Sequence, residues 1–179
     1  SILVNESLIE GRLVYLKTRN LASSQITNIF SFYGKSKNTA AEWKVHVDII
    51  KSKIKINNLE NIIIIGDFNF VTSILDRNNQ SLNTIDNAAV KNWTEIEKEC
   101  DLVDSFRITN PKRILYTYSH TDSKSKSRID RIYVSEEFST KIEATNFEST
   151  ILSDHKLIKL RIGCQIERGP GSWVFNNSL

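Results

Sequence analysis

The residues best suited to chemistry lie directly after a short run of isoleucines. Gly66, Asp67, Phe68 and Asn69 follow the apolar segment 62–65. Asp67 and Asn69 are two residues apart, so on an extended chain both side chains point the same way while Phe68 turns back toward the core. The same tetrapeptide is equally typical of a simple turn, so a functional interpretation needs polar partners from elsewhere in the chain.

Two later segments offer such partners. Asp130 lies at the start of the apolar segment 129–134, and Asp154 and His155 precede the apolar segment 157–162. Each alone is ordinary, because an aspartate beside arginines can form a surface ion pair and an Asp-His pair can sit in a solvated turn. Together they supply what phosphodiester hydrolysis requires: carboxylates for a hard cation, a base for water, and a histidine held in one tautomer by a carboxylate.

These motifs resemble those of the endonuclease/exonuclease/phosphatase superfamily, in particular the apurinic-endonuclease-like domains of LINE-type (non-LTR) retrotransposons. The resemblance runs over nearly the whole chain, and it also includes residues 28–34, Asp76-Arg77, residues 101–106, Thr117-Tyr118 and residues 168–179. It implies a Mg²⁺-dependent endonuclease that nicks DNA and leaves a 3′-hydroxyl to prime reverse transcription. Residues 1–164 would then form the larger C-terminal part of the nuclease domain, and residues 165–179 a connector toward a reverse-transcriptase region.

The resemblance also implies a role for each matching residue. His155 would stabilise or protonate the phosphoryl oxygen, Asp130 would fix its tautomer, and Asp67 would orient or deprotonate the attacking water. Asn69 and Tyr33 would hydrogen-bond the phosphate. Asp154 would lie in or beside the metal site, where Mn²⁺ could replace Mg²⁺.

A basic loop region is the predicted contact with DNA. Its predicted contact residues are Thr117, Tyr118, Lys124, Lys126, Ser127 and Arg128. A solvated charge run is an equally good interpretation of these lysines and arginines. His120, in the same region, could touch DNA or nothing, and Tyr33, beside Phe30 and Phe32, could instead be a core aromatic.

The sequence departs from the family pattern at its beginning. Members of the family open with strands that carry an Asn and then a Glu, the principal metal ligand, and neither Glu6 nor Glu10 sits in a matching motif. The chain starts at Ser1 and contains no methionine, so we expect a fragment that is catalytically impaired unless another chain supplies the missing segment. Two alternatives stay open: a non-catalytic nucleic-acid- or protein-binding scaffold of the same fold, and a small-molecule or lipid phosphoesterase.

The elements that must position these residues follow from hydrophobic periodicity. One helix is expected after a capping box of Thr39 and Glu42, and a second after a capping Asp86. Their buried faces would comprise Trp43, Val47, Ile50 and Ile54 in the first helix, and Ala89, Trp93, Ile96 and Cys100 in the second. His46 is expected on the surface of the first helix.

Short runs rich in β-branched and aromatic residues predict strands at residues 11–17, 25–33, 62–65, 114–118, 129–134 and 157–162. Polar, turn-prone loops are expected at residues 35–38, 76–87 and 119–127. Strands interleaved with two helices predict an α/β layered sandwich. The resemblance specifies a four-layer α/β/β/α sandwich of two mixed sheets that lacks its N-terminal strands.

Composition limits the class of protein. The 179 residues fit one globular domain, with 40% hydrophobic and 25% charged residues and a net charge of only +3. Cys100 and Cys164 form no metal-binding spacing or disulfide framework, which favours a reducing compartment, intracellular or nuclear. No apolar stretch approaches the roughly 20 residues that span a bilayer, so no membrane partner is expected.

Overall fold

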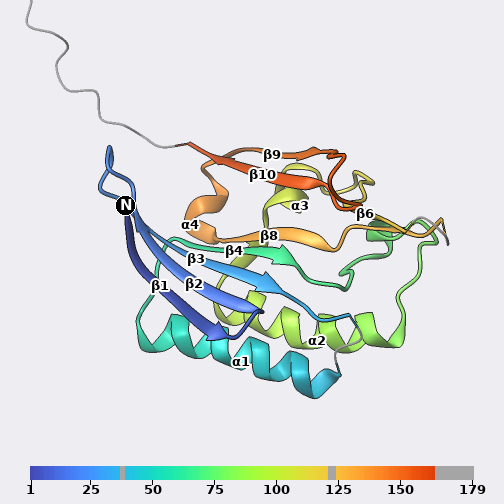
Figure 1. Cartoon of the computed structure of the whole chain (residues 1–179), viewed down its shortest axis with the longest axis horizontal. Helices are drawn as coiled ribbons and strands as arrows, with labels where there is room; N and C mark the ends of the chain where they lie inside the picture. Colours follow the sequence, from blue (N-terminus) through green and yellow to red (C-terminus); the bar gives the residue numbers. More distant parts are fainter. Residues whose placement is uncertain (37–38, 121–123, 164–179) are drawn as a thin grey trace, which may run out of the picture.

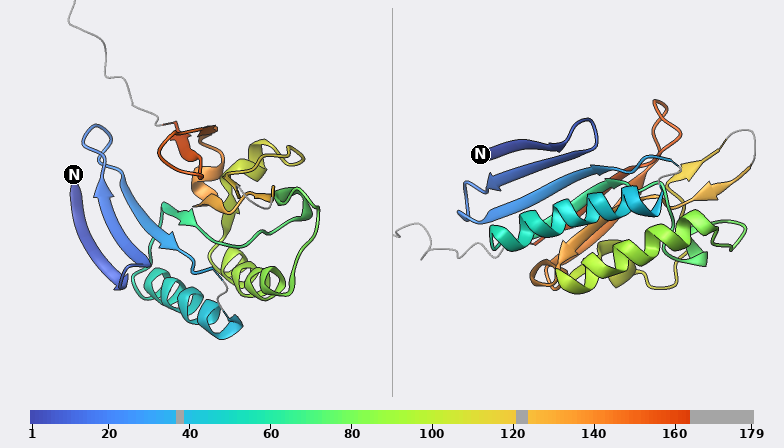
Figure 2. Two further views of the ribbon diagram at one scale, coloured as in Figure 1. Left: turned by 45° about the vertical axis from the view of Figure 1, so that its right-hand side comes forward. Right: turned by 90° about the horizontal axis from the view of Figure 1, so that it is seen from below.

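The chain folds around one mixed β-sheet that carries two long helices on one face and a second, smaller sheet on the other (Figures 1 and 2). The computed structural model describes residues 1–36, 39–120 and 124–163. Among these residues no helix is both long and apolar enough to cross a membrane. The expected connector, residues 165–179, and Cys164 lie outside the described residues.

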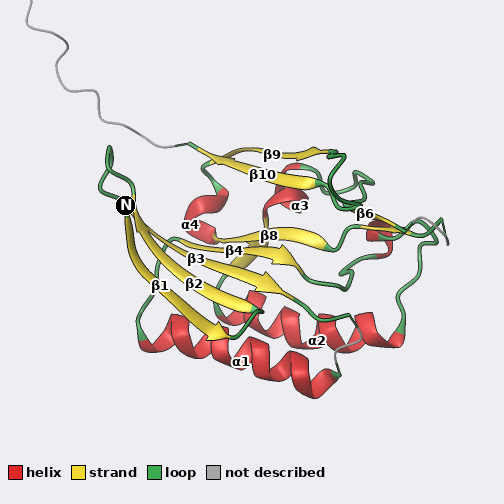
Figure 3. Cartoon of the chain, in the orientation of Figure 1, coloured by secondary structure: helices red, strands yellow, loops and turns green. Residues whose placement is uncertain are grey.

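Strands and helices are interleaved along the chain, with β1 to β3 and β6 to β8 following one another directly (Figure 3). They are β1 (Ile2–Ile9), β2 (Leu13–Arg19), β3 (Ile26–Tyr33), α1 (Ala40–Ile56), β4 (Ile62–Asp67), the 3₁₀ helix η1 (Ile74–Asp76), α2 (Thr84–Glu99), β5 (Leu102–Asp104), α3 (Ser105–Thr109), β6 (Tyr118–Ser119), β7 (Lys126–Ser127), β8 (Asp130–Ser135), α4 (Glu136–Ser139), β9 (Ile142–Glu148) and β10 (Leu157–Ile162).

The main sheet has the strand order β1-β2-β3-β4-β8-β5. Only β3 and β4 run parallel, joined through α1, and the other neighbours are antiparallel. The α/β class with a mixed central sheet is therefore confirmed. The second sheet is the antiparallel pair β9 and β10, so in the described residues this side of the sandwich is smaller than the expected second mixed sheet.

Helix α1 begins where the capping box predicts, with Thr39 as N-cap and Glu42 closing the box. Its buried face includes Trp43 and Ile50, as expected. The prediction that His46 lies on the surface is wrong, because His46 falls on the same stripe as Trp43 and is 8% exposed. Its Nδ1 lies 2.6 Å from the Glu42 carbonyl oxygen, and its ring packs edge-on against Phe32.

Helix α2 begins earlier than predicted, at Thr84. The N-cap is Asn83, and Asp86 is the third helical residue of a capping box rather than the cap itself. The carboxylate of Asp86 is buried, accepts a hydrogen bond from the Asn83 N–H at 3.0 Å and also binds Arg77. The predicted core face is confirmed at Ala89, Trp93 and Ile96, and the thiol of Cys100 packs partly buried beside it.

Several predicted boundaries shift, and four strands were missed. The predicted strand at residues 114–118 is wrong except at Tyr118, because only Tyr118 and Ser119 pair with β7 and Ile114 is about half exposed. The predicted loop 76–87 includes the first turn of α2. Strands β1, β5, β7 and β9 had no counterpart among the predictions, and β7 lies in the predicted loop 119–127.

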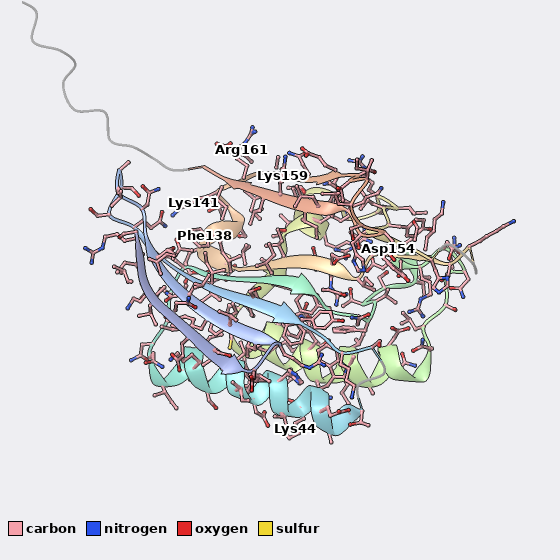
Figure 4. All side chains as sticks on the ribbon, in the orientation of Figure 1. Lys44, Phe138, Lys141, Asp154, Lys159 and Arg161 are labelled. Atoms are coloured by element: carbon pink, nitrogen blue, oxygen red, sulfur yellow. The ribbon has the colours of Figure 1, made fainter. Side chains whose placement is uncertain are left out.

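The main sheet separates two apolar layers. The aromatic layer, which faces α1 and α2, contains Phe30, Phe32, Trp43, Phe68 and Trp93. The opposite layer packs Ile132, Val134 and Phe138 against β9 and β10. In Figure 4, Phe138 lies between the two sheets, whereas Lys159 and Arg161 project outward from β10. Successive side chains of each central strand therefore point into opposite layers, and the site residues lie on the face toward β10.

Candidate active site

The sheet register brings three predicted site residues into one row. Tyr33 pairs with Asp67 across the parallel β3–β4 ladder, and Asp67 pairs with Asp130 across β4–β8. Cross-strand partners share a face of a sheet, so all three side chains face the β10 side. Tyr33 is 49% exposed, so the alternative that it is a core aromatic is wrong.

The turn after β4 is built around Gly66 and Asn69. A Cβ on Gly66 would meet the Phe32 carbonyl oxygen at 1.7 Å, so only glycine fits where β3 and β4 approach. Asn69 adopts a left-handed conformation, with φ of 53°. The backbone N–H of Asn69 donates to Asp67 Oδ1 at 2.8 Å. Its side-chain Nδ2 donates to Gly34 O at 2.6 Å and to Asp67 Oδ2 at 3.0 Å. Asn69 thereby fixes the Asp67 carboxylate, while Phe68 is fully buried as predicted.

Asp130 and His155 form a hydrogen-bonded pair although 25 residues separate them. His155 Nδ1 lies 2.9 Å and 3.0 Å from the two carboxylate oxygens of Asp130. The contact assigns the Nδ1 proton to the side facing Asp130, which leaves Nε2 available to a ligand. The Tyr118 ring packs against the imidazole with its centroid 4.8 Å away.

Thr117 joins the two strands that carry this pair. Its hydroxyl oxygen accepts hydrogen bonds from the backbone N–H groups of Ile129 and Asp130, each at 3.1 Å. Its carbonyl oxygen accepts from the Lys156 N–H at 2.7 Å, and the adjacent Tyr118 forms a β-bridge with His155. Thr117 is 1% exposed, so the prediction that its side chain contacts DNA is wrong, and its position is instead that of a support behind Asp130.

The carboxylates and the imidazole form one cluster. Ligand atoms of Asp67, Asp130 and His155 all lie within 4.8 Å of one another, a set of donors that could hold a metal ion. A groove of about 200 Å³ lies beside them, lined by Asp67, Asp130 and residues of β4 and β10. Burial, and next the charge of Asp130, raise the pKa of Asp67 to about 6. The carboxylate of Asp67 is therefore ionised at neutral pH but close to its titration.

Asp154 lies outside this cluster. Its side chain is exposed on the loop before β10, and Figure 4 labels it at the end of the molecule where this loop meets the main sheet. Its proposed part in metal binding stays a prediction. Of the predicted DNA contacts, Lys124 and Lys126 are exposed, Tyr118 is partly exposed, and Ser127 is buried.

Arg128 does not fit its predicted contact with DNA. Its side chain is fully buried, with Nε 2.7 Å from Asp76 Oδ1 and Nη2 2.8 Å from Asp104 Oδ2. Arg107 binds the same Asp76 carboxylate. Burial alone would raise the pKa of Asp76, but the Arg128 hydrogen bond and charge outweigh it, and the net pKa is lowered. Arg128 is therefore part of an internal ion cluster and has no exposed guanidinium to offer a phosphate.

Comparison with solved structures identifies the class of fold. The endonuclease domain of TRAS1, a telomere-specific non-LTR retrotransposon, has a TM-score of 0.69 at 15% identity, covering 92% of this chain and 69% of that one. An AP endonuclease from Leishmania major gives 0.70 at 16% identity, covering 84% of this chain and 54% of that one. An AP endonuclease from Archaeoglobus fulgidus gives 0.70 at 12%, covering 92% and 72%. The chain therefore has the endonuclease/exonuclease/phosphatase fold.

A sequence relative is a transposon protein. The 149 kDa protein of transposon TX1 from Xenopus laevis is 29% identical over 182 residues, covering 99% of this chain. The chain spans 13% of the length of that protein. No family model matches the sequence. The expected resemblance to LINE-type endonuclease domains is confirmed by the TRAS1 and TX1 similarities together.

Proposed function

We propose that this chain is the nuclease domain of a LINE-type retroelement protein, and that it nicks DNA by hydrolysis to leave a 3′-hydroxyl for reverse transcription. The observation that carries the proposal is the convergence of Asp67, Asp130 and His155 beside one groove, on a fold shared with endonucleases. DNA and a downstream reverse-transcriptase region would be its partners. The TX1 relative, far longer than this chain, supports the second partner.

Each side chain has a role that its surroundings support. Asp67 is ionised at neutral pH and is held by Asn69, so it can orient and deprotonate a water molecule in the groove. Asp130 holds His155 with Nδ1 turned toward the carboxylate and so fixes the orientation of the imidazole ring. With a second proton on Nε2, His155 can donate to a phosphoryl oxygen and stabilise the charge that develops there.

The donor set fits a divalent cation that is held through few protein ligands. Asp67 and Asp130 offer the oxygen atoms that Mg²⁺ prefers, and Asp154 is the nearby exposed carboxylate predicted to assist them. The cation would supply electrostatic stabilisation of the phosphate. Two clustered carboxylates among the described residues are a small set, so we expect weak Mg²⁺ binding and low activity from this chain alone.

Tyr33 and Asn69 complete the proposed substrate contacts. Tyr33 is exposed in the same row as Asp67, so its hydroxyl can reach a phosphate in the groove. Asn69 is more restricted, because its Nδ2 group already contacts Gly34 and Asp67. Its main contribution in this proposal is to hold Asp67. Lys124, Lys126 and Tyr118 are proposed to contact DNA outside the groove.

The discriminating experiment is a plasmid-nicking assay with supercoiled DNA, in Mg²⁺ and in EDTA. We expect slow Mg²⁺-dependent nicking that falls at least about 100-fold in Asp67→Ala and His155→Ala, since each removes an acid–base group. Asp48→Ala, a half-exposed aspartate on α1, is the matched control and should nick like the parent chain. Nicking that survives both site substitutions would overturn the assignment.

A non-catalytic scaffold that binds nucleic acid is the second candidate, favoured by the small donor set. In that case the chain would bind DNA with an affinity that falls as salt rises, yet would show no nicking at any Mg²⁺ concentration. The same plasmid assay, run beside a binding titration, separates the two functions.

A further inference from the structure

The row of site residues extends one strand further than the motifs indicate. Tyr33 N–H donates to the Arg12 carbonyl oxygen at 2.8 Å, directly after the Leu13–Phe32 pair of the β2–β3 ladder. Leu13 and Phe32 are buried toward the helices, so Arg12 and Tyr33 face the other way, toward the β10 side. Arg12, Tyr33, Asp67 and Asp130 thus form a continuous row across four adjacent strands.

Arg12 has an aromatic ring rather than a carboxylate as its side-chain partner among the described residues. Arg77, Arg107 and Arg128 each bind a carboxylate, whereas no carboxylate of the described residues lies within ion-pair distance of Arg12. Its guanidinium instead lies over the exposed Tyr33 ring, 5.4 Å from the centroid. Its Nη1 is shielded from solvent and has no hydrogen-bond partner.

A guanidinium held in this way is suited to an anionic ligand. The aromatic ring orients the planar cation without neutralising it, and a guanidinium can bind phosphate oxygens through its N–H donors. Neighbouring strands are about 4.8 Å apart, so the backbones of Arg12 and Asp67 are separated by about 10 Å. An arginine side chain at that distance can reach past Tyr33 to a backbone phosphate next to the one being cleaved.

We infer that Arg12 binds a phosphate of the cleaved DNA strand, adjacent to the scissile phosphate, with Tyr33 as the platform that orients its guanidinium. The inference rests on the proposed function, because it takes the groove at Asp67 and Asp130 as the position of the scissile phosphate. It adds a substrate contact from β2, a strand that carries none of the motif residues.

The test is a binding titration of this chain with a short fluorescently labelled DNA duplex in EDTA, repeated across a range of salt. For Arg12→Ala we expect binding about three- to tenfold weaker at low salt, and a log–log salt slope lower in magnitude by about one. Arg12→Lys keeps the charge but loses the planar stacking, so it should keep the slope while weakening binding. Arg19→Ala, at the exposed far end of β2, is the control and should match the parent.

Failure of the Arg12 role and failure of the proposed function give different results in this experiment. A parent chain that binds DNA with the usual salt dependence, together with an Arg12→Ala variant of identical affinity and slope, would overturn the role of Arg12 alone. A parent chain that does not bind DNA would overturn both this role and the proposed function. Matching circular dichroism spectra and melting temperatures would establish that the variants are folded.

Discussion

At the scale of single residues, the support behind the Asp130–His155 pair is as specific as the pair itself. Thr117 contributes its hydroxyl to the Asp130 strand and its carbonyl to the strand that follows His155. One buried residue thereby sets the distance between two groups that are remote in sequence. Small displacements of such groups reduce catalysis strongly, because reactive geometry depends on fractions of an ångström.

Replacing Thr117 tests this support. In Thr117→Val the shape is kept but two buried backbone N–H groups lose their acceptor, so we expect nicking to fall about 10- to 100-fold. Thr117→Ser keeps the hydroxyl and should restore most of the activity. The downfield NMR signal of the His155 Nδ1 proton should weaken in the valine variant only. An unchanged signal and unchanged nicking in Thr117→Val would contradict the role.

Most residues of the candidate site could be predicted from the sequence, and the wrong predictions have a physical cause. Asp67, Asn69, Asp130 and His155 come together as predicted, because each follows or opens an apolar strand and strand ends meet at a sheet edge. The prediction that Arg128 contacts DNA was wrong because a local motif does not show whether a side chain is buried. Here Arg128 is buried against Asp76 and Asp104, which are distant in sequence. Arg12 lies outside every motif, and only the strand register reveals its position.

At the scale of elements, periodicity predicted the helices better than the strands. Both long helices bury the faces that their spacing indicates, since a continuous apolar stripe over four turns is unambiguous. Strands β5 and β7 were missed because they are very short, and β1 and β9 because none of their residues is fully buried. Such strands have weak hydrophobic patterns, and their pairing partners decide whether they form. The predicted strand at residues 114–118 did not form over most of its length, because only Tyr118 has a pairing partner in β7.

The contact between α2 and β8 contains a second perturbed carboxyl group, on Glu97. Burial raises the pKa of Glu97 to about 7, and the charge of Arg131 offsets only part of this effect. The folded state then holds a proton that the unfolded state, with an ordinary glutamate pKa near 4.5, releases. Stability from this group is therefore present at low pH and is lost as pH rises through about 7.

Replacement of Glu97 by glutamine removes this dependence. We expect Glu97→Gln to raise the free energy of unfolding by roughly 1–3 kcal/mol at about pH 8, with a clearly smaller gain at about pH 5. Urea denaturation at both pH values measures the difference. Glu136→Gln, an exposed substitution in α4, should show no such pH dependence. A gain that is equal at both pH values would rule out titration of Glu97 as its cause.

At the scale of the whole molecule, a buried ion cluster links segments from four parts of the chain. Arg128 joins Asp76 of η1 and Asp104 of β5, and Arg107 of α3 closes the cluster. The cluster fixes the position of Arg128, which lies two residues before Asp130. Removing one partner of a buried pair leaves an uncompensated charge, which is more damaging than the loss of a surface ion pair.

Arg128→Met tests how far the molecule depends on this cluster. The methionine fills a similar volume but leaves Asp76 and Asp104 buried without their cation, so we expect a loss of about 3–5 kcal/mol in the free energy of unfolding. Arg161→Met, on the outer face of β10, is the matched control and should change it by less than about 0.5 kcal/mol. Urea midpoints measure both, and equal midpoints would show that the cluster is dispensable.

The placement of His155 has a consequence for how the molecule loses function. His155 lies on the segment just before β10, whose inward side chains are only partly buried, whereas Asp67 and Asp130 belong to strands β4 and β8 of the main sheet. Local stability follows burial, so the β9–β10 pair opens at a lower free-energy cost than the central strands. A transient detachment of this pair withdraws the histidine while the aromatic layer stays intact, and inactivation on warming then precedes global unfolding.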